Sequence, residues 1–206
     1  MAIAAALLLT GCGGGADSDS GKAVALTKEQ VRQTLPDSGT MTGWNESARP
    51  TAVEMNQLYR SQGCPIKDHA GCETSRFYGA STFRREDSAA TATFLIIAYE
   101  SEQAARDAYN VLWNGYYGQR AGQQARTFNL GPIDEKRDAR FGSAGFHDEP
   151  GTVTQTRVGT TLLWTMMDST DKNKNAVNEN STRGLATLLA KRARQTQNGD
   201  APSATL

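Results

Sequence analysis

The hydrophobic positions between residues 76 and 99 follow a strand pattern. Residues 89–99 contain Thr91, Thr93 and the run Phe94-Leu95-Ile96-Ile97, which is β-prone throughout and apolar on both faces near its end. A strand that is apolar on both faces is buried on both, so this segment is predicted to lie in the centre of a sheet. Residues 76–84 predict a second strand, joined to the first by the polar turn at 85–87.

A further hairpin is predicted near the C-terminal end. Residues 152–158 and 161–167 alternate in polarity, and Gly159-Thr160 between them is typical of a hairpin turn in which glycine supplies a positive φ. Residues 128–133 predict a short strand. Residues 136–151 are rich in charge and glycine, and we expect them to be irregular.

Four segments predict helices. Thr27 and Gln30 form a capping box that begins a helix ending before Pro36. Ser101 caps a helix through about residue 117, whose alanines recur at spacings of three and four and favour close packing on a sheet. A weaker helix is predicted over 51–62, and a last one lies within 174–194. Residues 37–50 are expected to form a loop or a short edge strand.

The predicted strands are joined by hairpins rather than crossovers, in the order α-α-β-β-α-β-β-α. We therefore expect an α+β fold with an antiparallel sheet of about four to six strands and helices packed mainly on one face. A single domain is expected over residues 26–195. Residues 12–25 are rich in Gly, Ser and Asp and predict a flexible tether, and residues 196–206 predict a disordered tail.

An apolar run at residues 2–8 leads into Leu9-Thr10-Gly11-Cys12, which resembles a bacterial lipobox. The run is too short to span a bilayer and is typical of a secretion signal. The resemblance implies that residues 1–11 are a lipoprotein signal peptide. It also implies that Cys12 carries the lipid, palmitate included, which anchors the protein to the extracytoplasmic face of the cell membrane. No Lys or Arg precedes the run, so we expect translation to start upstream of residue 1.

Charge and cysteine content narrow the possible functions. The chain has 22 basic and 22 acidic residues, and this balance argues against nucleic-acid binding, which needs a concentrated basic surface. With Cys12 lipidated, Cys64 and Cys72 remain as an even pair in an oxidising compartment and predict a disulfide. The alternative is a zinc site formed by Cys64, His69 and Cys72, but no fourth ligand is obvious nearby. We therefore expect neither a metal nor another cofactor.

Candidate catalytic groups are few. The two histidines are His69, inside the cysteine loop, and His147, in the run His147-Asp148-Glu149 that is typical of a solvated loop. The segment at 142–145 is not a Gly-x-Ser-x-Gly elbow. The sequence therefore favours a protein without catalytic activity.

Four aromatic residues recur at helical spacings beside the alanine stripe: Tyr109, Trp113, Tyr116 and Tyr117. As a binding site, they would line a cleft for a sugar, a peptide or a lipid, because aromatic side chains offer large contact areas with polar tips. As structural residues, they would form a second packing face under the cysteine loop. The pattern alone leaves both interpretations open.

The lipobox, the strand at 92–99 running into Ser101-Glu102-Gln103-Ala104-Ala105, and the hairpin with Gly159 at its turn occur together in actinobacterial cell-envelope lipoproteins, which this chain resembles. The order of elements over residues 26–194 is also similar to the extracellular sensor domains of mycobacterial serine/threonine kinases. That resemblance implies a disulfide-stabilised antiparallel sheet with helices and a ligand-binding cleft. Those sensors typically have two disulfides, whereas this chain has one candidate pair and no kinase.

These observations favour a lipid-anchored extracytoplasmic binding or sensing domain without catalytic activity. Its partners would be the membrane, through Cys12, and an unknown small ligand or envelope protein. One alternative is an envelope lipoprotein that binds another protein and no small ligand. Another is an extracytoplasmic hydrolase, which would need His69 or His147 beside a carboxylate in a pocket.

Overall fold

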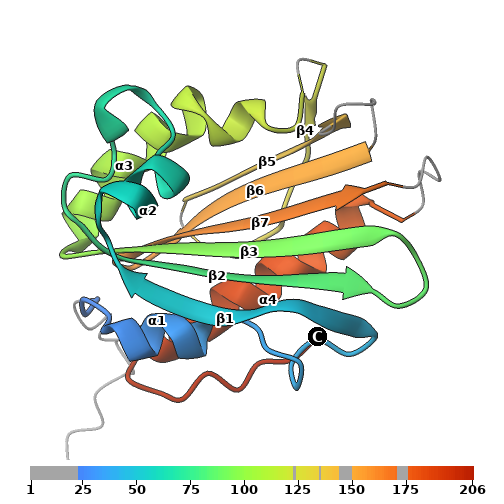
Figure 1. Ribbon diagram of the computed structural model, residues 1–206, viewed down its shortest axis with the longest axis horizontal. Coiled ribbons are helices and arrows are strands. Elements are labelled where there is room, and N and C mark those ends of the chain that lie inside the picture. Colours follow the sequence, from blue (N-terminus) through green and yellow to red (C-terminus); the bar gives the residue numbers. More distant parts are fainter. Residues whose placement is uncertain (1–22, 123, 135, 144–149, 171–175) are drawn as a thin grey trace, which may run out of the picture.

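The computed structural model describes residues 23–122, 124–134, 136–143, 150–170 and 176–206. Within them, seven strands form one antiparallel sheet in the order β1-β2-β3-β7-β6-β5-β4 (Figure 1). The strands are β1 (Trp44–Glu54), β2 (Ser75–Arg85), β3 (Ala90–Tyr99), β4 (Arg126–Thr127), β5 (Lys136–Ser143), β6 (Pro150–Val158) and β7 (Thr161–Ser169). The helices are α1 (Lys28–Thr34), α2 (Gln57–Gly63), α3 (Glu102–Gly115) and α4 (Glu179–Gln197). Two single turns of 3₁₀ helix, η1 (Lys67–His69) and η2 (Tyr117–Gln119), complete the elements.

Strand β3 lies in the interior of the sheet, between β2 and β7, as its sequence predicts, and separates two hydrophobic clusters. Leu95, Ile97 and Tyr99 belong to the cluster that contains the α3 side chains. The alternate residues Phe94 and Ile96 belong to the cluster that contains α1 and α4. Because successive strand side chains point to opposite faces, both faces of β3 are buried.

The α+β class and the antiparallel sheet are confirmed, but two details of the prediction are corrected. The sheet has seven described strands rather than four to six, and the helices cover both faces rather than mainly one (Figure 1). Helices α1 and α4 share one face although they are far apart in the sequence. Helices α2 and α3 and the cysteine loop cover the other. A sheet whose central strands are apolar on both faces needs a helical layer on each.

The N-terminal half of the sheet differs most from the prediction. Residues 44–54 form the edge strand β1, and the predicted helix at 51–62 is reduced to α2, capped by Asn56. Two register shifts, between Glu46 and Ala48 and between Ala48 and Thr51, carry β1 past Pro50. Proline is tolerated there because an edge strand need not donate on its outer side. The stretch predicted to be irregular contains β5, which pairs with β6 over its full length.

The segment after α4 is ordered, contrary to the predicted tail. Buried Arg192 of α4 donates hydrogen bonds to the carbonyl oxygens of Pro202 and Ala204, and the Leu206 amide donates to the Thr40 carbonyl. The same guanidinium also bonds the carbonyls at the end of α1: Gln33, Thr34 and Leu35. Arg192 thus caps a neighbouring helix and fixes residues 198–206 beside it. Desolvation by burial lowers the pKa of this guanidinium.

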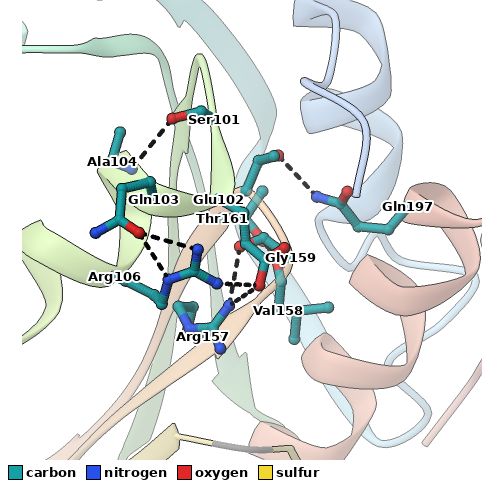
Figure 2. Close-up of polar contacts among 11 residues, drawn as sticks. Ser101, Glu102, Gln103, Ala104, Arg106, Arg157, Val158, Gly159, Thr161 and Gln197 are labelled. Atoms are coloured by element: carbon teal, nitrogen blue, oxygen red, sulfur yellow. Dashed lines mark hydrogen bonds and ion pairs between the residues drawn. The ribbon is translucent and has the colours of Figure 1, made fainter. Parts of the chain in front are cut away.

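The β6–β7 turn is clamped from both helical layers (Figure 2). Buried Arg157 of β6 lies 3.0 Å from the Glu102 carboxylate at the start of α3, which Arg106 also contacts at 2.7 Å. On the other side, the Gln197 amide of α4 donates to the Thr160 hydroxyl, which in turn donates to the Val24 carbonyl. The chain therefore enters the described part of the molecule at this turn.

The predicted disulfide is present. Cys64 and Cys72 are bonded and both are completely buried, against the α3 side of the sheet. Since both sulfurs are used in this bond, the alternative zinc site at Cys64, His69 and Cys72 is excluded. No helix within the described ranges has the length and hydropathy needed to cross a membrane.

Candidate functional site

The predicted aromatic row converges, but most of it lies in the core. Tyr109, Trp113 and Tyr117 are 1%, 7% and 1% exposed, and only Tyr116 is half-exposed. The Tyr117 ring stacks on Trp164 of β7 at a centroid distance of 4.3 Å. These side chains pack beside the disulfide between α3 and the sheet. The structure therefore supports the interpretation as a packing face, because Tyr109, Trp113 and Tyr117 expose little surface that a ligand could contact.

The buried hydroxyls of this row are used in structural hydrogen bonds. The Tyr109 hydroxyl donates to the Asp138 carboxylate at 2.9 Å and lies 3.0 Å from the Gln155 carbonyl oxygen. The Tyr117 hydroxyl donates to the Gly63 carbonyl, and the Tyr99 hydroxyl to the Gly71 carbonyl. Burial raises the pKa of all three phenols, and at Tyr109 the adjacent Asp138 carboxylate raises the pKa further. These phenols are therefore held neutral and bonded, which suits support of the core.

A hollow of about 520 Å³ opens at the other end of the sheet, where β2 turns into β3. We call it the Trp44 hollow. It lies between the start of β1, the β2–β3 turn and the first turns of α4, and residue 206 completes its wall. The lining side chains used below are Trp44, Arg85, Glu86, Asp87, Asn180 and Ser181. A hollow of this size falls in the range of small-molecule sites.

Contacts with Trp44 and Asp87 fix the Arg85 side chain in the wall of the hollow. The Arg85 guanidinium lies over the Trp44 ring, 5.9 Å from its centroid, and its Nε is 2.9 Å from the Asp87 carboxylate. The guanidinium is therefore held on two sides. Gly184 lies on the helix wall, and a Cβ added there would meet no atom within 4 Å. The space in front of this helical turn is thus open.

The lining chemistry combines one indole, one guanidinium, two carboxylates, an amide and hydroxyls. Arg85 and Asp87 neutralise each other, which leaves Glu86 as the unbalanced charge at the rim. Such a set offers both donors and acceptors around an aromatic edge. It can orient a polar molecule, but it contains no pair of nucleophile and base.

A second hollow, of about 450 Å³, lies between α3 and the cysteine loop. Its walls are mostly small side chains, and its two carboxylates are already bonded within the chain. Glu73 accepts from the Gly71 amide, and Asp107 accepts from Gln103. Both carboxylates of this hollow are therefore engaged, whereas the Glu86 carboxylate of the Trp44 hollow has no such bond within the described chain.

The residues needed for a hydrolase are not brought together in the described chain. The His69 Nδ1 lies 3.3 Å from the Cys64 carbonyl oxygen, inside the disulfide loop. His147 and the lipidation candidate Cys12 lie outside the described residues. Among the described residues, no group of three His, Cys, Asp or Glu side chains is placed to hold a metal ion.

Comparisons with known proteins give a likeness of fold. No protein-family model matches the chain, and no curated protein matches its sequence. Among solved structures, the chain is similar to the extracellular domain of PknH from Mycobacterium tuberculosis, with a TM-score of 0.54 and 8% sequence identity. The match covers 86% of this chain and 100% of that one. The expected likeness to a mycobacterial kinase sensor domain is therefore found in the fold, whereas no sequence match supports the lipoprotein family.

Proposed function

We propose that this protein is an exported, non-catalytic ligand-binding domain of the sensor type, and that the Trp44 hollow is its ligand site. The observation that carries the proposal is the hollow itself, because it brings an indole edge, a positioned guanidinium and a helical amide and hydroxyl to one open space. The fold likeness to an extracellular domain supports the same class. The buried disulfide supports export, because such bonds persist in oxidising compartments.

The lining indicates the class of ligand. Because two carboxylates face a single guanidinium, the hollow disfavours an anion. Its mixed donors and acceptors suit a polar molecule with several hydroxyl or amide groups, such as a mono- or disaccharide. The ligand would enter beside the β2–β3 turn and contact the helix wall at Asn180 and Ser181.

Gly184 provides a direct test of the site. Gly184→Phe would fill the open space of the hollow, whereas Gly184→Ala adds one methyl group to the same wall. Both replace a helical glycine, so both should retain or raise stability, by about 0.5–1 kcal/mol for alanine. The pair therefore separates blockage of the hollow from damage to the fold.

The readout is native mass spectrometry of protein secreted by an actinobacterial host, together with titrations of N-acetylglucosamine and maltose. A co-purified mass or a saturable probe present in the wild type and in Gly184→Ala, but lost in Gly184→Phe, would support the proposal. Binding that persists in Gly184→Phe would contradict the assignment of the site.

The anchor forms a separate part of the proposal. Cys12 would carry the lipid, and Cys12→Ala should move the protein from the membrane fraction to the medium and abolish its labelling by palmitate. Unchanged membrane association in Cys12→Ala would refute the anchor without affecting the ligand site.

A further inference from the structure

Two arginines converge on the η2 turn, away from the Trp44 hollow. Arg140 of β5 donates from Nη1 to the Gly118 carbonyl at 2.8 Å, and Arg120 directly follows the turn. Gly118 allows this close arrangement, because a Cβ there would lie 2.8 Å from the Trp113 carbonyl oxygen and 3.0 Å from its ring. The turn is thus pressed onto Trp113.

Each guanidinium lies over an aromatic ring of the α3 row. Arg140 Cζ is 5.8 Å from the Trp113 centroid, and Arg120 Cζ is 5.6 Å from that of Tyr116. Arg120 also donates to the Tyr116 hydroxyl at 2.8 Å. Both planar groups are therefore preorganised, and each retains unused N–H donors.

Neither arginine forms an ion pair with any described residue, in contrast to Arg106 and Arg157. Arg140 shares its sheet face with Asp138, two residues away, but that carboxylate accepts from the Tyr109 hydroxyl. Ring contacts and hydrogen bonds thus hold the half-buried Arg140 and the exposed Arg120 at one turn, with no counter-charge among the described residues. An anion bound at this turn would accept from the unused guanidinium N–H groups and supply the missing counter-charge.

We propose that Arg120 and Arg140 form an oxyanion site for a phosphate group. The fork of a guanidinium matches two phosphate oxygens, and two such forks held on rings lose little freedom on binding. The chain has no formal net charge, so it does not attract anions in general. Saturable binding of phosphate would therefore indicate a specific site. The site is separate from the Trp44 hollow and does not depend on the proposed function.

The test is a titration of the full chain, in micelles of a neutral detergent, with inorganic phosphate. The arginine Nε–H resonances are followed by NMR. We expect saturation with a dissociation constant on the order of 1 mM. Arg140→Gln and Arg120→Gln should each weaken binding about tenfold or more, because each removes charge-assisted hydrogen bonds. Arg84→Gln is the matched control, since Arg84 is an exposed arginine on the same sheet face and should leave the affinity unchanged.

A second arm identifies the source of the phosphate. Vesicles of phosphatidylglycerol and of phosphatidylcholine are compared for binding of the full chain carrying Cys12→Ala, with and without Arg140→Gln, so that no lipid on Cys12 holds the protein to either vesicle. Retention on anionic vesicles that is lost in Arg140→Gln would assign the site to a lipid headgroup, whereas saturable binding of free phosphate alone would assign it to a soluble phosphate compound. Absence of both, or an equal loss in Arg84→Gln, would overturn the proposal. Fold integrity of each variant is checked by its thermal unfolding.

Discussion

Replacing Arg192 tests the most connected side chain of the fold. Arg192 is 4% exposed, and its guanidinium donates to five backbone carbonyls, three at the end of α1 and two in residues 198–206. In Arg192→Met the apolar stem is largely preserved, but all five acceptors lose their donor.

The expected loss follows from the fate of these acceptors. The two carbonyls of the C-terminal segment reach water once that segment detaches, so their loss costs little. The three α1 carbonyls lose a charged donor at a helix C-terminus, at about 1.5–3 kcal/mol each before relaxation. In the wild type, the cost of burying the charged guanidinium offsets part of the stability that these hydrogen bonds provide. The same burial lowers the pKa of Arg192. We therefore expect a net decrease of about 3–5 kcal/mol in the free energy of unfolding, which corresponds to about 10 °C in Tm.

Urea unfolding measures this change, and hydrogen exchange locates it. In Arg192→Met the Leu206 amide, which is bonded to the Thr40 carbonyl, should lose its protection while β3 amides keep theirs. Arg192→Lys is the matched control, because an ammonium has the same charge but three donors, and it should lose about half as much stability. A change below about 1 kcal/mol in Arg192→Met, with Leu206 still protected, would refute the role assigned to Arg192.

Three further predictions concern the core. Replacing both Cys64 and Cys72 by Ser should lower the free energy of unfolding by about 2–3 kcal/mol, because the unfolded chain gains the entropy of the opened loop. Thermal melts measure the change, and an unchanged Tm would contradict this prediction. Ser81→Ala should raise stability by up to about 1 kcal/mol, because no described residue bonds its buried hydroxyl, whereas Ser75→Ala, which loses a bond to the Cys72 carbonyl, should lower it. Folding raises the pKa of the buried phenols Tyr99, Tyr109 and Tyr117, so their contribution to the free energy of unfolding is complete below pH about 10, the pKa of an unfolded tyrosine. Above that pH the free energy of unfolding, measured by denaturant melts, should fall by up to about 4 kcal/mol per pH unit. A free energy of unfolding that stays constant there would contradict this prediction.

The sequence predicted those helices, turns and strands that are specified by residues close together in the chain. The capping box at Thr27, the Ser101 cap of α3 and the hairpin turn at Gly159 all occur where the sequence places them. The β3 run is also confirmed, because an apolar strand of this length has few alternatives. Each of these depends on contacts within a few residues of the chain.

The remaining features depend on distant contacts. Strand β1 contains Pro50 and many exposed polar residues, so only its pairing with β2 identifies it as a strand. The ordered segment at 198–206 depends on hydrogen bonds from Arg192, which also reach the end of α1, 158 residues earlier in the chain. The Trp44 hollow joins residues 44, 85, 180 and 206, which have no shared motif. A site assembled from the ends of four elements has no local signature.

The hydrogen bond from Thr160 to the Val24 carbonyl fixes the place where the N-terminal segment joins the fold. The chain enters at the β6–β7 turn, beside the end of β3, whereas the Trp44 hollow lies beyond the start of the same strand. Nine strand steps separate these ends, a span of about 30 Å. In a protein held through its N-terminal segment, the hollow would thus lie about one strand length, roughly 30 Å, from the point where that segment joins the fold. The β6–β7 turn would be the part of the fold nearest to that attachment.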